Sequence, residues 1–104
     1  MRIAANAGSF YPSSKEEILK LIELFNEIYE SSNAYKEQKK IVPKAVISPH
    51  AGYIYSGYSA NIAHRVLARK KVKRVVVIGP SHHVYFEGIS GSFYNKFQTP
   101  IKDL

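Results

Sequence analysis

The sequence predicts an α/β fold built on a βαβ unit, as part of a three-layer α/β sandwich. Two short apolar runs, Ala45–Ile47 and Val75–Ile78, are typical of parallel strands that are buried on both faces. Between them lies a stretch in which apolar residues recur with helical spacing. A strand, a helix and a strand within residues 44–78 imply two parallel strands joined by a right-handed crossover.

The first expected element is a helix over residues 15–30. Ser14 and Glu17 have the spacing of a capping box, with a hydroxyl at the N-cap and a carboxylate three residues later. Its apolar residues recur at helical spacing and should form one buried face: Ile18, Leu21, Ile22, Phe25, Ile28 and Tyr29. Residues 31–40 are polar and are expected to form a loop.

The βαβ unit is expected to follow. Its strands should span residues 44–48 and 73–78, and its helix should run from about Gly57 to Arg69. Ser56 is a candidate N-cap for this helix, whose buried face should carry Tyr58, Ile62, Val66 and Ala63. After Gly79 the regular pattern ends, and residues 89–93 are expected to form a short strand.

These elements leave a sheet with an open edge and a poorly covered face. Parallel sheets are normally buried on both sides, and an irregular stretch of about 20 residues is unusual in a compact domain. We therefore expect residues 1–104 to form one partial domain, the N-terminal part of a larger α/β domain. Self-association or a missing C-terminal segment would have to cover the sheet.

Composition narrows the class of protein. A hydrophobic content of 45% and a charged content of 22% are those of a globular chain. The chain has no cysteine, which excludes disulfides and thiolate ligands supplied by these residues. No apolar run approaches the ~18 residues of a membrane span, and the first residues lack a signal-peptide core. We expect a cytoplasmic protein that does not bind a membrane.

The formal net charge of +7 is concentrated in two stretches. One contains Lys36, Lys39 and Lys40, and the other contains Arg69, Lys70, Lys71, Lys73 and Arg74. A lysine-rich solvated surface accounts for both, and the second stretch could complement a helix dipole. Because no motif that reads nucleic acid accompanies them, nucleic acid ranks lowest among the expected partners.

Two histidines occupy corresponding places after the two expected strands. His50 follows the first apolar run and His82 follows the second. The ends of parallel strands meet on one rim of the sheet, which is where open α/β sheets bind ligands. Two imidazoles on one rim suit iron, copper, nickel or zinc. On geometry alone, a metal site and a pair of ordinary turn histidines are about equally supported.

Other residues near these turns are candidates for pocket-lining roles. Tyr53 lies three residues after His50, and Ser81 could orient a neighbouring imidazole by a hydrogen bond. His83 is either a contact within the pocket or a plain loop residue, whereas His64 should lie on the surface of a helix. The chain contains no Walker loop and no GxSxG, CxxC or HExxH motif. It therefore lacks the sequence signatures of P-loop NTPases, α/β-hydrolases, thiol redox proteins and HExxH metalloproteases.

Four motifs resemble those of the Memo family in order and spacing. They are AGSFY at residues 7–11, PHAGYIYSG at 49–57, GPSHH at 79–83 and TPIKDL at 99–104. The resemblance implies a fold related to class III extradiol dioxygenases, an α/β sandwich around a central sheet. It also implies that His50 and His82 match two histidines that line a metal site. The third ligand of the family is a cysteine further along the chain, absent from these residues.

The resemblance implies two alternative functions. One is a metal-binding redox enzyme of the dioxygenase type, a non-haem oxidoreductase that uses iron or copper on a small molecule. The other is a non-catalytic adaptor that holds a peptide or phosphopeptide in the same cleft. In the first alternative His50 and His82 are metal ligands of the intact protein, and the catalytic residues and substrate stay open.

Overall fold

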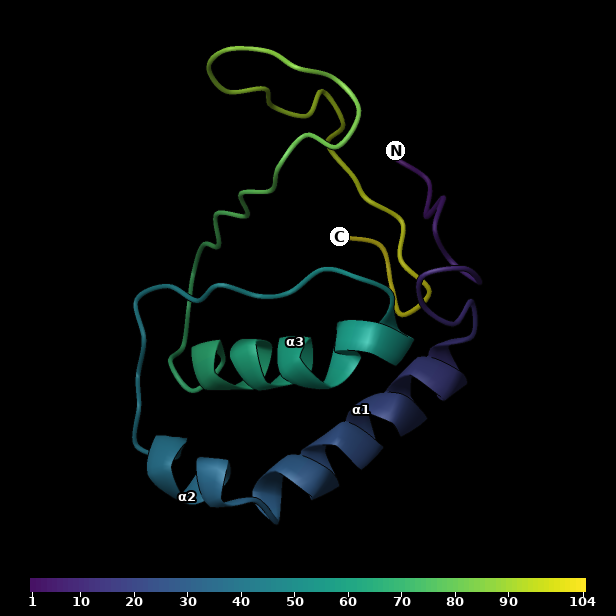
Figure 1. Cartoon of the computed structure of the whole chain (residues 1–104). Helices are drawn as coiled ribbons and strands as arrows, with labels where there is room; N and C mark the ends of the chain where they lie inside the picture. Colours follow the sequence, from purple (N-terminus) through teal and green to yellow (C-terminus); the bar gives the residue numbers. More distant parts are fainter.

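The structure is a computed structural model that describes residues 1–104 and contains three helices (Figure 1). They are α1 (Lys15–Glu30), α2 (Asn33–Gln38) and α3 (Tyr53–Leu67). α1 packs against both other helices. The residues before α1, between α2 and α3, and after α3 form loops and extended segments. None of the helices has the length and apolarity that a membrane crossing requires.

Helix α1 confirms the predicted bounds, although its cap differs in detail. The Glu17 backbone N–H donates to Ser14 Oγ over 3.3 Å, as in a capping box. The Ser14 hydroxyl in turn donates to Glu16 Oε2 over 2.9 Å, so the carboxylate comes from Glu16 and not from Glu17. Ile18 and Tyr29 are buried, but Ile28 is 50% exposed and does not belong to the buried face.

Two predictions about the other helices are wrong. Residues 33–38 form α2 instead of a loop, because the Ser32 hydroxyl caps it by accepting the Tyr35 N–H over 3.2 Å. Helix α3 begins at Tyr53, four residues before the predicted start, and its N-cap is Gly52. The Tyr53 N–H donates to the Phe10 carbonyl over 2.7 Å, so a distant backbone group replaces the expected Ser56 cap.

A glycine permits the close contact between α1 and α3. A Cβ atom at Gly57 would lie 3.0 Å from Cε2 of Phe25, closer than nearly all real Cβ contacts, so the Phe25 ring would have to shift. Phe25 also meets Tyr58 edge to face, with ring centroids 6.1 Å apart. Beside this contact, Asn61 Nδ2 donates to Asn26 Oδ1 over 2.8 Å. The two helices are therefore joined by both apolar and polar contacts.

Tyr29 joins all three helices and is the most buried side chain in the structure. Its hydroxyl donates to Gln38 Oε1 over 2.9 Å, and its ring meets the ring of Tyr35 edge to face at 5.3 Å. The guanidinium of Arg65 lies 5.6 Å from the centre of the Tyr29 ring and forms a 2.7 Å ion pair with Glu30. α1, α2 and α3 thus share one buried residue.

The predicted strands at residues 44–48, 73–78 and 89–93 are not present. Only two isolated bridges occur, joining Arg2 to Phe97 and Ala7 to Tyr11. The apolar residues of the expected strands are exposed except for the half-buried Val46, with Ile47 at 100% and Ile78 at 90%. A strand is stable only within a ladder of neighbouring strands, and these segments have none. The three-layer α/β sandwich is therefore not confirmed, and the observed fold is a small helical unit with unpaired extended segments.

Candidate functional site

The structure brings His50 and His82 together. Their ring centroids lie 5.2 Å apart with an angle of 42° between the ring planes. Both side chains are exposed, and each follows one of the unpaired extended segments. His83 lies beside them, with its ring centroid 6.4 Å from that of His82. Three imidazoles from two distant parts of the sequence therefore form one exposed cluster.

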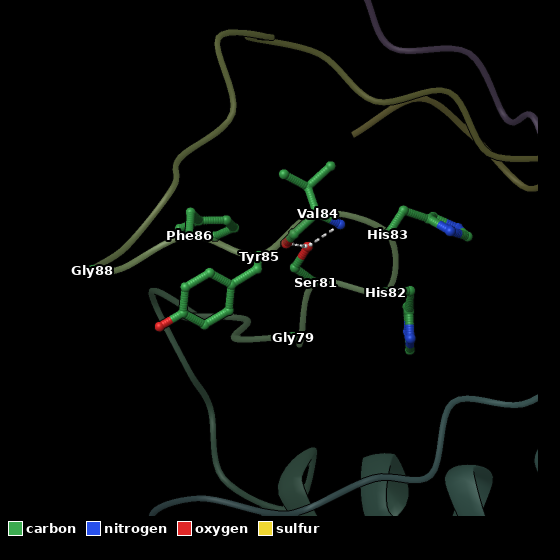
Figure 2. A pocket seen from close by; sticks show the side chains of 8 residues that line it. All are labelled: Gly79, Ser81, His82, His83, Val84, Tyr85, Phe86 and Gly88. Carbon is green, nitrogen blue, oxygen red and sulfur yellow. Dashed lines mark hydrogen bonds between the residues drawn. The ribbon is translucent and has the colours of Figure 1, made fainter.

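The turn that carries His82 is held by Ser81. The Ser81 hydroxyl donates to the Val84 carbonyl over 2.6 Å and accepts the Val84 N–H over 3.3 Å. Figure 2 shows this hydrogen-bonded turn, with His82 and His83 leaving it on one side and Tyr85 and Phe86 on the other. Ser81 therefore fixes the backbone around His82, and the expected hydrogen bond from Ser81 to an imidazole is not present.

The segment after His50 is held by the N-terminal loop. The Phe10 carbonyl, which accepts the Tyr53 N–H, would lie 3.3 Å from a Cβ atom at position 52. Gly52 therefore leaves room for a backbone carbonyl, and any added side chain would crowd it. This contact fixes the start of α3, and hence the turn that carries His50, against residues far away in the sequence.

Tyr53 is half-buried against Tyr11, and their ring centroids lie 5.7 Å apart. Burial raises the pKa of the Tyr53 phenol, and the neighbouring Tyr11 raises it further. Tyr53 is therefore protonated at neutral pH and can donate a hydrogen bond. The sequence indicated Tyr53 as a pocket residue and Tyr11 as a packing residue before the first helix, but it did not predict the contact between them.

The chemistry of the histidine cluster fits part of a transition-metal site. His64, on α3, has its Nδ1 atom 2.8 Å from the Ala60 carbonyl, as expected for a surface helix residue. No hydrogen bond involves the ring nitrogens of His50 or His82, which leaves them free to coordinate. No group of three or more His, Cys, Asp or Glu side chains is placed to hold a metal ion. Although His83 lies beside His82, residues 1–104 thus offer one close pair of imidazoles and no third side chain placed to complete a metal site.

Comparison with known proteins identifies relatives across the whole chain. The family model described as "Memo-like protein" matches residues 2–104. A MEMO1 family protein of Aquifex aeolicus is 37% identical over 100 residues, which cover 96% of this chain and 34% of that protein. A MEMO1 family protein of Schizosaccharomyces pombe is 38% identical, over 100% of this chain and 31% of its own length. Protein MEMO1 of Homo sapiens is 32% identical, over 99% and 32% respectively.

The chain spans about a third of the length of the curated relatives that it matches. No solved structure matches it.

Proposed function

Because the chain belongs to the Memo-like protein family, we propose that it supplies two histidine ligands, His50 and His82, to the metal site of a redox enzyme. The observation that carries this proposal is the meeting of the two imidazoles, with ring centroids 5.2 Å apart. Neutral imidazole is a good ligand for iron and copper, and either ion, when bound, would supply redox chemistry. The third ligand would come from a part of the protein outside residues 1–104.

The protein's own residues would hold this site in shape. The Ser81 turn would set the direction of His82, and the contact between Phe10 and Tyr53 would set that of His50. The protonated phenol of Tyr53, three residues after His50 and packed on Tyr11, is a further hydrogen-bond donor. We propose that a small-molecule substrate binds beside the imidazoles, where His83 is also exposed.

We propose further that the extended segments 44–48 and 73–78 become strands of an α/β sandwich in a chain of family length. Their apolar side chains are exposed, as shown by Ile47 and Ile78. Burying them would stabilise the fold by about 25 cal/mol for each Å² of apolar surface removed from water. Neighbouring strands from the rest of such a chain would supply both the ladder and this cover.

A peptide-binding adaptor is the alternative use of the same cleft. It would draw on the free N–H groups at the start of α3 to hold a phosphate. The Tyr53 N–H already donates to the Phe10 carbonyl, so this helix end has lost one of its donors. The loss of this donor weighs against the adaptor, whereas the meeting of the two imidazoles supports the metal site.

Metal loading tests the proposed function. The protein expressed from the complete reading frame, here called the complete product, is loaded anaerobically with Fe²⁺ or Cu²⁺ and desalted. It should retain about one metal ion per chain, whereas residues 1–104 alone should retain little. The reason is that two ligands bind a metal much more weakly than a complete site does. Failure of the complete product to retain either metal would overturn the proposal. Tight stoichiometric binding by residues 1–104 would overturn the inference of an external third ligand.

The Ser81 turn gives a second prediction. Replacing Ser81 with alanine removes both hydrogen bonds to Val84 and should weaken metal binding about 10- to 100-fold, the effect of losing a group that orients a ligand. Ser81→Thr keeps the hydroxyl and should bind metal as the wild type does. Calorimetric titration of the complete product compares the three proteins, and equal affinities for all three would exclude a positioning role for Ser81.

A further inference from the structure

The two basic stretches of the sequence meet in the structure and form one surface. The guanidinium of Arg69 donates to the Gln38 carbonyl and, over 3.3 Å, to the Ile41 carbonyl. This contact ties the end of α2 to the chain just after α3, and Figure 1 shows both on the same side of the molecule. The exposed cations around this contact, here called the basic surface, are Lys36, Lys39, Lys40, Lys44, Lys70, Lys71, Lys73 and Arg74.

The basic surface accounts for the net charge of the whole chain. It holds eight of the 15 lysine and arginine residues, and Glu37 is the single acidic residue within its two stretches. Eight cations and one anion give +7, which equals the formal net charge of the protein. The rest of the chain is therefore neutral, with five of its acidic residues on α1, so the charge is segregated onto one region.

The fold itself makes little use of these cations. The single ion pair of the structure joins Arg65 to Glu30, and neither residue belongs to the basic surface. Helix α3 ends at Leu67, so Lys71 and Lys73 lie beyond the last turn, where the helix dipole no longer acts. Complementing the dipole, the interpretation drawn from sequence, therefore does not explain them. Arg69 is the one basic residue of the two stretches whose side chain forms hydrogen bonds.

We propose that the basic surface binds the phosphate backbone of nucleic acid without reading its sequence. Double-stranded DNA presents one negative charge per about 1.7 Å of its axis, a density that can neutralise several clustered lysines at once. Seven of the eight cations are lysines, which act as point charges and lack the rigid planar fork that arginine offers for base recognition. The amide of Gln38 is already bonded to Tyr29, and the Tyr35 ring packs on Tyr29, so neither is free to contact a base.

The same observations disfavour an anionic membrane as the partner. Membrane-surface segments combine lysine with inserted Trp, Phe or Leu side chains. The two basic stretches, residues 36–44 and 69–74, contain none of these three residue types, and their exposed apolar side chains are the shorter Ile41, Val42 and Val72. Nucleic acid bound here would also leave the histidine cluster uncovered, because the cations lie before or at the starts of the extended segments, whereas His50 and His82 follow their far ends.

Fluorescence anisotropy with a labelled duplex DNA of random sequence tests this proposal on the full chain. The logarithm of the association constant should fall linearly with the logarithm of the salt concentration between about 50 and 200 mM. For eight phosphate contacts, the slope of this line should be no steeper than about −7. The double variants Lys39→Gln/Lys40→Gln and Lys70→Gln/Lys71→Gln should each weaken binding and reduce the slope by about two. The matched control Lys15→Gln/Lys20→Gln removes two positive charges, as each of the other double variants does, but removes them from α1. It should bind the duplex as the wild type does.

Three results would overturn the proposal. The first is no binding at the lowest salt concentration. The second is an equal loss in the α1 control and in the surface variants, which would indicate a general effect of net charge. The third is equal or tighter binding to vesicles of phosphatidylcholine with phosphatidylserine, which would make a membrane the partner. Because every replaced lysine is exposed, thermal melting followed by circular dichroism should show unchanged folding in all variants.

Discussion

Replacing either His50 or His82 with alanine is expected to abolish stoichiometric metal binding by the complete reading-frame product. Each change removes one of two adjacent imidazoles and leaves too few ligands to hold an ion. Loss of a group that merely orients a ligand costs about 10- to 100-fold in affinity, so loss of the ligand itself should cost more than about 100-fold. Metal content after anaerobic loading and desalting measures the effect.

His64 provides the matched control for this experiment. It is also an exposed histidine, but its ring is bonded to the Ala60 carbonyl on α3 and takes no part in the cluster. His64→Ala should therefore retain the metal. Retention of a full equivalent by both His50→Ala and His82→Ala would contradict the assignment of these residues as ligands.

Tyr29→Ala is expected to give the largest loss of stability among single changes outside the site. It would leave a cavity at the junction of the three helices, remove the hydrogen bond to Gln38 and strip the partner from the Tyr35 ring. Truncating a buried aromatic side chain costs about 3–5 kcal/mol, enough to unfold a small helical unit. Urea unfolding followed by circular dichroism at helical wavelengths measures the change.

Two further variants separate the contributions to this loss. Tyr29→Phe keeps the ring and removes the hydroxyl, so it should lower the free energy of unfolding by about 1 kcal/mol. Tyr85 is 89% exposed, and Tyr85→Ala should change that free energy by less than about 0.5 kcal/mol. If Tyr29→Ala proved no more destabilising than Tyr85→Ala, Tyr29 would not be the residue that joins the helices.

The helices show which structural features local sequence determines. The bounds of α1 were predictable because its periodic apolar face and its Ser14 cap lie within the helix and the residue before it. Helix α2 was missed because its sequence is polar, and it depends on contacts of Tyr35 and Gln38 with Tyr29. The start of α3 was misplaced for a similar reason, since it is set by the distant Phe10 carbonyl.

The extended segments show which structural features local sequence does not determine. The apolar runs before His50 and His82 have strand-like composition, but composition supplies no hydrogen-bonded neighbour, and neither run forms a ladder. The pairing of the two histidines was nevertheless predictable from their corresponding positions after the runs. No third ligand for the proposed metal site could be predicted, since residues 1–104 contain no group of three side chains placed to hold a metal ion. The basic surface was missed because Arg69 joins two stretches that are far apart in sequence.

X-ray absorption spectroscopy of the iron- or copper-loaded complete product tests the central claim most directly, because imidazole rings scatter with a recognisable outer-shell pattern. Two histidine nitrogens should be present in the coordination shell of the wild type, and one should remain after His82→Ala if any metal is retained. A shell without histidine, or one that His82→Ala leaves unchanged, would contradict the assignment of His50 and His82 as a metal-binding pair.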